Sequence, residues 1–576
     1  MKNILSNTLS ILADSERKKF YVFTMLNAII SIADIAFLGL LVLLVGVYTK
    51  ADFHFHLPPS IPVKLLNPDS IYPALFFLFC FIIKNTLAYI AGFLQYRYIY
   101  HVALRIAGNN LLYYLEGDYN EYSGIDSSVH IQKISQQPIE FCHYVLTGIL
   151  QMFTEYTLII FTVIGILLYN APSFLLLLIL LLPAVLVLAY FNKRRLKAVR
   201  LHIKTTSEKT MQHLYEALGS YVESNIYNKK EFFSKRYIHY QGLLNKYLSD
   251  LTIIKGLPSR FIEILAITGF FILVFIHIAF GNSDAVSLVT IGAFTVAVYK
   301  IIPGIAKILN ISAQIHAYAY TTQNLSKSGL SRSPVLKNTS ITERINSVEF
   351  KEVVYRYSQD KENSSVKKHI NLNLGKGDFL GISGASGKGK TTIFNLLLGF
   401  LEPMEGNILI NGGKTNEEKR KLYWKDIAYS RQHAFLIHDS ILKNITLDED
   451  HVNEERLNTA IYISGLSELL DKYPDGVHHV INENGKNISG GQRKRIVLAR
   501  TLYKEAGLIL LDEPFNELDR NSGTIILKHL QKLTEAGKIV VVITHDKESL
   551  SFCNKIISLD ELYSQNIDHS YSGISG

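Results

Sequence analysis

The sequence predicts an all-α membrane domain with six transmembrane helices, followed by a soluble α/β nucleotide-binding domain of the P-loop kind. Apolar runs concentrate before about residue 310, and a glycine-rich phosphate-binding motif lies later in the chain. The chain has 576 residues, which is too long for one compact core. We expect the transmembrane domain over 1–325, a linker over 326–344 and the nucleotide-binding domain over 345–576.

Six apolar runs predict the membrane domain. The hydrocarbon core of a bilayer requires about 20 mostly apolar residues per helix. One such run would be compatible with a buried helix of a soluble protein, but six in succession favour membrane spans. The runs are Phe20–Thr49, Ile71–Tyr96, His143–Tyr169, Ser173–Phe191, Phe261–Phe280 and Ala285–Leu309.

The distribution of basic residues predicts the orientation of these spans. Asn192–Arg200 is densely basic and Ser15–Lys19 precedes the first span, so both are expected in the cytoplasm. The short segments Tyr169–Ser173 and Gly281–Ala285 contain no Lys or Arg and are expected to be turns on the outside. Both chain termini are therefore predicted to be cytoplasmic.

Two long cytoplasmic connections, 97–142 and 192–260, have helical rather than loop-like patterns. We expect them to protrude beyond the bilayer and to reverse near Glu116–Gly124 and Leu214–Asn225. From Thr321 to Asn346 the composition changes to Ser, Thr, Asn and Lys, which is typical of a linker.

Charge and cysteine content exclude some classes of protein. The formal charge is +9, but the basic residues flank apolar runs and no groove-reading motif accompanies them, so we expect no nucleic-acid partner. Cys80, Cys142 and Cys553 show neither metal-ligand spacing nor a disulfide framework, and are predicted to be small buried apolar residues. The N-terminus lacks the pattern of a cleaved signal peptide.

The phosphate-binding motif GASGKGKTT lies between a predicted strand, Asp378–Ser383, and a predicted helix, Thr391–Phe400, as a P-loop requires. Its backbone N–H groups and the helix N-terminus would hold the phosphates of ATP. Lys390 would pair with the β- and γ-phosphates, and Thr391 would offer its hydroxyl to Mg²⁺. The predicted ATP-binding residues of this loop are Gly384, Ala385, Ser386, Gly387, Lys388, Gly389, Lys390, Thr391 and Thr392.

The predicted apolar strand Leu508–Pro514 ends in two carboxylates. Asp512 is expected to bind Mg²⁺, and Glu513 is placed to polarise the attacking water as the catalytic base. In isolation such a pair would often only cap a turn. Its position downstream of the phosphate-binding loop favours the catalytic interpretation.

A turn of small residues, Ser489–Gly491, opens a further predicted helix whose N-terminus can face an anion. The segment NISGGQRKR, Asn487–Arg495, resembles the signature of the ATP-binding cassette (ABC) transporters, Leu-Ser-Gly-Gly-Gln, with Ile488 in place of the Leu. Six spans followed by one cassette resemble a half-transporter of the exporter type. The resemblance therefore covers nearly the whole chain.

The resemblance implies roles for four more residues at matching positions. Tyr357 would stack on adenine, and Asp519 belongs to the loop that crosses the dimer. Gln432 would sense Mg²⁺, take part in catalysis and touch the membrane domain. His545 would contact the γ-phosphate during catalysis.

The resemblance also implies a dimer in which two cassettes enclose two ATP molecules. Ser489, Gly490 and Gly491 of one chain would complete the nucleotide site of the other. Since no element of the site is missing, a homodimer would have two competent sites. ATP binding would draw the cassettes together and hydrolysis would release them, which drives alternating access in the membrane domain.

This sequence departs from the family pattern in two respects. Lys388 stands where the family usually has a small residue, and adds positive charge near the phosphates. The Asp512–Asp519 run and the Thr544–Asp546 run are more usual in other branches of the superfamily. The direction of transport is therefore inferred from the membrane half, because importers rarely fuse six such spans to a cassette.

Ionisable residues inside the predicted spans are candidates for substrate contact, because each is costly in hydrocarbon unless it is paired or faces water. Asp34 and Lys84 are expected to pair between the first two spans. Lys300 and Lys307 are expected to extend toward the interface. The set either binds a polar headgroup or fixes helix packing. Its members are Asp34, Lys84, Glu155, Arg260 and Glu263.

Within the family, Val298–Ile308 and Tyr215–Phe233 look most similar to bacterial flippases for lipid-linked oligosaccharides. We therefore predict an ATP-driven exporter or flippase that moves an amphipathic substrate, a lipid-linked oligosaccharide or a lipid, across a bacterial cytoplasmic (inner) membrane. Export of a peptide or natural product is the alternative. A non-transporting ATP-gated regulator is less favoured, because Glu513 and the signature glycines are both present.

Overall fold

The computed structural model describes residues 2–49, 71–117, 119, 126–279, 288–327, 343–355, 369–433 and 435–560, without the side chains of 168–201 and of most of 255–300. The chain forms two compact units. Met1–Gly117 and Glu121–Val335 form the first, and Asp118–Asn120 with Leu336–Gly576 form the second.

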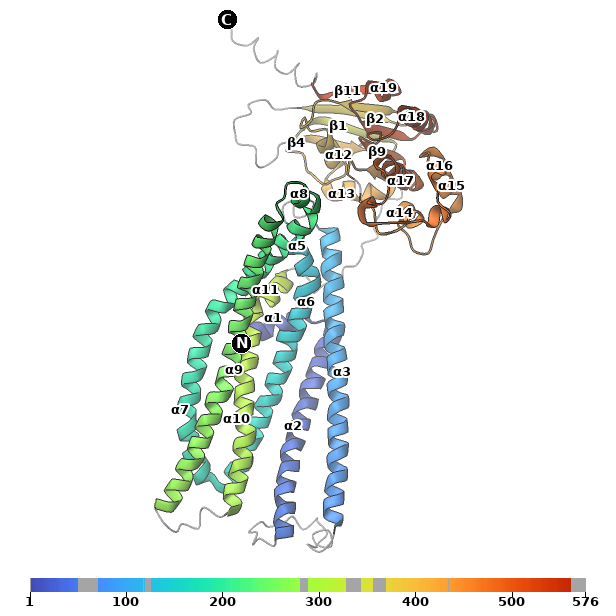
Figure 1. Ribbon diagram of the computed structural model, residues 1–576. Helices are drawn as coiled ribbons and strands as arrows, with labels where there is room; N and C mark the ends of the chain where they lie inside the picture. The colour runs from blue at the N-terminus through green and yellow to red at the C-terminus, as the bar shows by residue number, and fades with distance from the viewer. Residues whose placement is uncertain are drawn as a thin grey trace. The chain divides into compact units, whose positions relative to one another are not determined.

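The first unit is helical throughout its described residues (Figure 1). Its long helices contain more residues than are needed to cross a bilayer. The helices are α1 (Lys2–Ile11), α2 (Asp14–Thr49), α3 (Tyr72–Glu116), α5 (Ser127–Ile131), α6 (Gln137–Glu140), α7 (Thr147–Gly219), α8 (Tyr221–Ile226), α9 (Lys230–Ala279), α10 (Leu288–Ala317) and α11 (Ala319–Lys327), with π-helical turns η2 (Gln132–Gln136) and η3 (Phe141–Leu146).

Among the described residues, three helical stretches are long and apolar enough to cross a membrane: Asp14–Leu41, Tyr72–Glu116 and Ser127–Gly165. They correspond to the first three predicted spans. The backbones of the other three predicted spans are largely helical, within α7, α9 and α10. Their side chains lie mostly outside the described set.

The predicted turn at Tyr169–Ser173 is wrong as a break in the helix, because α7 continues through it. The predicted reversal of the chain nevertheless occurs. Gln132 Nε2 donates a hydrogen bond to Ser207 Oγ at 3.1 Å across 75 residues of chain, whereas a straight helix would separate them by about 110 Å. The midpoint between these two residues falls inside Tyr169–Ser173, so the helical backbone itself bends back there.

The chain reverses within both of the long connections, 97–142 and 192–260. Asn110 Nδ2 on α3 donates to the Lys133 carbonyl at 2.8 Å, so the chain reverses between these two residues, and most of the predicted turning point at Glu116–Gly124 lies outside the described residues. The His202 ring on α7 stacks on Tyr247 of α9, with 5.1 Å between centroids. The chain between them ends α7, forms the short α8 and begins α9, as expected near Leu214–Asn225.

The change in composition that begins at Thr321 falls inside a helix. Composition suggested a linker from Thr321, but α11 continues to Lys327. Thr321 and Leu325 are buried, and Leu325 belongs to the core of the helical unit together with Tyr318 and Tyr320. Apolar neighbours supplied by the tertiary structure thus stabilise a helix that the polar composition did not indicate.

The second unit is an α/β domain (Figure 1). A parallel sheet has the order β11-β3-β10-β9-β6, an antiparallel sheet has the order β2-β1-β4-β5, and β7 pairs with β8. The strands are β1 (Ser347–Val354), β2 (Ile370–Gly375), β3 (Phe379–Ser383), β4 (Glu405–Ile410), β5 (Gly413–Thr415), β6 (Ile427–Ser430), β7 (Asp439–Ser440), β8 (Val480–Ile481), β9 (Leu508–Asp512), β10 (Ile539–Ile543) and β11 (Lys555–Ser558). The helices are α12 (Lys390–Leu397), α13 (Glu417–Leu422), α14 (Ile441–Thr446), α15 (Glu454–Ile463), α16 (Ser467–Leu470), α17 (Gly490–Tyr503), α18 (Arg520–Glu535) and α19 (Lys547–Ser551).

The parallel sheet brings the predicted catalytic segments to one edge. Strands β9 and β10 are buried along their whole length, which accounts for their unbroken apolar sequence. Ile543 at the end of β10 pairs with Ile382 of β3 and with Asp512 of β9. The three strands therefore end together, and ligands of such sheets bind beyond these carboxyl ends.

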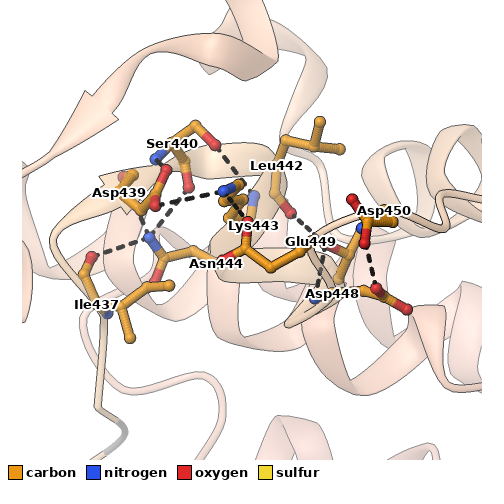
Figure 2. A network of polar contacts seen from close by, with 10 residues as sticks. Ile437, Asp439, Ser440, Leu442, Lys443, Asn444, Asp448, Glu449 and Asp450 are labelled. Carbon is orange, nitrogen blue, oxygen red and sulfur yellow. Dashed lines mark hydrogen bonds and ion pairs between the residues drawn. The ribbon is translucent and has the colours of Figure 1, made fainter. Parts of the chain in front are cut away.

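A buried amide organises the segment that follows the Gln432 loop. Figure 2 shows Asn444 on α14 at the centre of this network. Its Nδ2 donates to the carbonyls of Ile437, Asp439 and Ser440 at 3.0, 3.3 and 3.1 Å, and its Oδ1 accepts from the Ile437 N–H at 2.9 Å. The residue is completely buried. Asn444 thus fixes the backbone over Ile437–Ser440.

Candidate nucleotide-binding and catalytic site

The loop from Gly384 to Gly389 joins β3 to α12, as the motif predicted. Gly387 and Gly389 have φ angles of 80° and 90°, in a region that residues with a Cβ rarely adopt. Ala385, Ser386, Gly387 and Lys388 are exposed, so the loop is open to a ligand. The N–H groups at the start of α12 suit this loop to bind an anion.

The side chain of Lys390, the first residue of α12, extends into this loop. Its ammonium donates to the carbonyls of Gly384 and Ala385 at 2.6 and 3.2 Å, and lies 2.9 Å from His545 Nε2. The side chain is buried. The loop is therefore wrapped around a positive charge, and His545 lies at the same point; the predicted contacts of both residues with the phosphates stay predictions.

Thr391 and Asp512 meet at the start of α12. Thr391 Oγ1 donates to Asp512 Oδ2 at 3.1 Å. Asp512 is buried, and burial raises the pKa of its carboxyl. A hydroxyl and a carboxylate oxygen are the ligand types that Mg²⁺ prefers, so these two residues fit the cation predicted for this position.

Glu513 is held by side chains from three segments. Its Oε2 accepts from Gln432 Nε2 at 2.7 Å and from Asn516 Nδ2 at 2.8 Å, and its Oε1 lies 3.4 Å from His545 Nε2. Glu513 itself has a positive φ of 48°, and its N–H donates to the Ile543 carbonyl. Positive φ is uncommon for such a residue and often marks a functional site.

Two residues of this network were missed by the sequence analysis. Asn516 lies three residues after Glu513, and that short spacing was the available signal. Lys494 on α17 donates to the carbonyls of Gln432 and Glu513 at 2.7 and 3.3 Å. Because both acceptors are backbone atoms, no side-chain pattern could indicate this contact.

The signature turn lies at the N-terminus of α17. Ser489 is exposed and caps the helix: its Oγ accepts from the Gln492 N–H at 3.3 Å, and its N–H donates to Gln492 Oε1 at 2.8 Å. Ile488, which replaces the family's Leu, is buried. A pocket of about 440 Å³ is lined in part by Ser489, Gly490, Gly491 and Asp519.

Asp519 caps α18 and accepts from the Ser522 N–H at 2.9 Å. Hydrogen bonds from Ser522 lower the pKa of this carboxyl, which keeps it ionised. Arg495 of α17 lies 3.5 Å from it. The predicted site residues thus form two sets, one around Lys390 and Glu513 and one around Ser489 and Asp519. Tyr357, the predicted adenine contact, lies outside the described residues.

The described ionisable residues of the membrane spans are paired. Lys84 forms the predicted ion pair with Asp34, and lies over the Phe81 ring. Glu155 pairs with Lys307 at 3.0 Å, and the Lys307 side chain is 63% exposed, so its extension toward the interface stays a prediction. The side chains of Arg260, Glu263 and Lys300 lie outside the described set.

The absence of a side chain at Gly304 explains how Glu155 and Lys307 come close enough to pair. A Cβ at Gly304 would lie 3.1 Å from Ile159 Cγ1 and 3.3 Å from Glu155 Oε2, so α10 approaches α7 closely at this point. Lys307, one turn further along α10, is thereby brought within reach of the carboxylate. This contact depends on the close spacing of α7 and α10, which no local sequence pattern indicates.

Comparison with known proteins agrees with this arrangement. The sequence model of the ABC transporter family matches residues 367–516. An ATP-dependent lipid A-core flippase of Neisseria meningitidis is 25% identical over 420 residues, which cover 72% of this chain and 66% of the flippase, just under two thirds of its length. The corresponding flippase of Burkholderia pseudomallei is 24% identical over 419 residues, covering 72% of this chain and 70% of the relative.

A similarity in fold covers nearly the whole chain. The structure of a bacterial Atm1-family ABC exporter with ATP bound superposes with a TM-score of 0.73, covering 98% of this chain and 99% of that chain at 16% identity. At this identity the superposition establishes the fold alone. Taken with the ABC transporter match over residues 367–516 and the flippase relatives, this fold supports an ABC exporter half-transporter.

Proposed function

We propose that this chain hydrolyses ATP to move an amphipathic lipid substrate across the cytoplasmic (inner) membrane of a bacterium, with both termini in the cytosol. One observation carries the hydrolytic part of the proposal. Glu513, Gln432 and His545 lie together at the edge of the sheet where the phosphate-binding loop also ends. A carboxylate beside a phosphate cradle is the arrangement that water attack on a phosphoryl group requires.

Each side chain of this network has a proposed task. Glu513 is the base that orients and polarises water, and Gln432 and Asn516 hold its carboxylate in place. When ATP binds, the Lys390 ammonium leaves the loop carbonyls and contacts the β- and γ-phosphate oxygens instead. His545, next to both Lys390 and Glu513, contacts the γ-phosphate.

Thr391, Asp512 and Gln432 are the residues proposed to hold Mg²⁺. When bound, the cation would neutralise charge on the phosphate oxygens. Burial raises the pKa of Asp512 in its absence, and the charge of a neighbouring cation would lower that pKa again. The Asp512 position is therefore suited to bind a cation together with its nucleotide.

We further propose that two copies of the chain form the working transporter. Ser489, Gly490, Gly491 and Asp519 line a pocket at the N-terminus of α17, in a set separate from the residues around Lys390. A helix N-terminus with free N–H groups favours a negatively charged ligand. The triphosphate bound to a second copy would supply that ligand, so that each chain completes its partner's site.

The proposed substrate class is a lipid with a polar headgroup, such as a lipid-linked oligosaccharide. The names of the flippase relatives support a lipid substrate. Because Lys84 and Glu155 already have partners within the helical unit, we propose that these pairs fix helix packing rather than bind the headgroup.

The test is a translocation assay with the full-length protein in proteoliposomes. Polyprenyl-linked glycans, lipid A-type glycolipids and amphipathic peptides are compared for stimulation of ATP hydrolysis and for movement across the bilayer. Stimulation and movement of a lipid-linked species are expected. Stimulation by peptides alone would assign the chain to peptide export and overturn the lipid proposal.

Glu513→Gln tests the hydrolytic site in the same membranes. It should lower ATP hydrolysis by about 100-fold or more while ATP still binds, because it removes the base and leaves the cradle intact. Glu505→Gln is the matched control, since Glu505 is a half-exposed carboxylate paired with Arg456 at 2.8 Å. Hydrolysis at the parental rate by Glu513→Gln would show that the base is misassigned.

A further inference from the structure

Lys494 joins three segments of the cassette that otherwise come from different elements. It lies on α17, and its ammonium donates to the Gln432 carbonyl, after β6, and to the Glu513 carbonyl, after β9. The side chains of Gln432 and Glu513 are themselves hydrogen-bonded at 2.7 Å. The Lys494 ammonium, the two backbone carbonyls and the hydrogen-bonded side chains of Gln432 and Glu513 therefore form a closed ring of contacts.

This ring of contacts restrains the backbone of Glu513. Glu513 has a positive φ of 48°, a strained conformation that persists only where neighbouring groups hold it. Bonds from a charged donor are roughly twice as strong as neutral ones. Lys494 is suited to hold the Glu513 backbone, and through it the direction of the carboxylate.

A second contact ties α17 to the same loop. Arg500, further along α17, donates to the Phe435 carbonyl at 2.9 Å and to the Asn444 carbonyl at 2.6 Å. Asn444 is the buried amide at the centre of Figure 2. The loop that carries Gln432 is thus held at Gln432 by Lys494 and at Phe435 by Arg500, both from one helix.

Two neighbouring parts of α17, its N-terminus and the turn that follows, therefore have different tasks. Its N-terminus, Ser489–Gly491, lines the pocket proposed to receive the partner's nucleotide. About one turn later, Lys494 contacts the residues proposed to hydrolyse the chain's own nucleotide. A shift of α17 on docking would move Gln432 and Glu513 in the same step.

We propose that Lys494 is a positioning residue that couples the two nucleotide sites of the dimer, by linking the docking of α17 on the partner's nucleotide to the placement of Glu513. This inference rests on the proposed function, a dimer with two shared sites. It predicts that ATP hydrolysis by the wild-type protein is cooperative in ATP. It also predicts that the cooperativity depends on this lysine.

Lys504 provides a matched control. It caps the other end of α17 and donates to the carbonyls of Trp424 and Ile427, each at 2.6 Å. Burial lowers the pKa of both Lys494 and Lys504. The two lysines thus have the same chemistry on the same helix, and only Lys494 contacts Gln432 and Glu513.

The experiment measures ATP hydrolysis against MgATP concentration for the full-length protein in nanodiscs. Lys494→Met should lower kcat by about 10-fold or more with KM changed less than about 3-fold, and should reduce the Hill coefficient toward one. Lys494→Arg should recover part of both losses, because it retains donors. Lys504→Met should leave kcat within about 2-fold and the Hill coefficient unchanged.

The outcomes separate the inference from the proposed function. Unchanged kcat and Hill coefficient in Lys494→Met would overturn the inference, and so would an equal loss in Lys504→Met. A wild-type protein that hydrolyses ATP as a single copy would instead overturn the dimer. Should Lys494→Met fail to fold, Lys494→Gln is compared with Lys504→Gln, and the same two parameters decide.

Discussion

The dimer can be tested by placing two inactivating substitutions either in one chain or in opposite chains. Each proposed site uses Glu513 of one copy and Ser489 of the other. Glu513→Gln removes the base, and Ser489→Arg places a long side chain at an exposed turn that lines a pocket of about 440 Å³. Loss of the Ser489 cap should cost α17 only about 1 kcal/mol, so the cassette stays folded.

The expected magnitudes follow from counting intact sites. When both substitutions are in one chain and the partner is wild type, each of the two sites carries one defect, and hydrolysis should fall to the level of Glu513→Gln. When the substitutions are in opposite chains, both defects fall in one site and the other is intact. That dimer should retain about half of the wild-type rate at most, and less than half where the two sites are coupled as proposed above.

The assay uses two copies with different affinity tags, co-expressed and purified in tandem so that only mixed dimers are measured. ATP hydrolysis in nanodiscs is compared for the two arrangements at equal protein concentration. A clear excess for the opposite-chain arrangement supports shared sites. A higher rate for the same-chain arrangement would refute the reasoning, because it would mean that Ser489 acts on the nucleotide of its own chain. Equal rates would also refute it, because they would mean that Ser489 does not contribute to hydrolysis.

Two further predictions concern stability. Asn444→Ala should destabilise the cassette by about 2–4 kcal/mol, because it leaves the half-buried Ile437 N–H and several carbonyls without the bonds that Asn444 makes; a thermal melt checks this, and an unchanged midpoint would contradict it. Asp512→Asn should raise the melting temperature of the nucleotide-free protein near neutral pH but not near pH 4. Burial raises the pKa of the folded Asp512 carboxyl, so the folded state loses stability as pH rises above the ordinary carboxyl pKa, and the amide removes that loss. A gain of equal size at both pH values would show that ionisation is not the cause.

Much of the fold could be predicted because its signals are local. Apolar runs of bilayer length indicated the spans, and the structure finds the first three among its described residues. The phosphate-binding loop was placed between a strand and a helix, and it joins β3 to α12. Asp512 was placed at the end of a buried strand, where β9 ends.

The errors of the sequence analysis arose where a neighbour distant in sequence outweighed local composition. Thr321 is polar, but apolar side chains from the helical core stabilise its helix. The Tyr169–Ser173 segment contains turn residues, yet its backbone stays helical while the chain reverses. Propensity is a weak guide in such places because tertiary packing overrides it.

The sequence by itself determined which residues we propose for phosphate and water chemistry, since glycines, a lysine and carboxylates at fixed spacing form a site through the backbone geometry that they adopt locally. Only the tertiary structure decided how that site is held. The bonds from Lys494 to two carbonyls and the pairing of Glu155 with Lys307 depend on which loops and helices approach one another. Backbone acceptors are the same at every position, so no residue pattern can indicate which of them a side chain will reach.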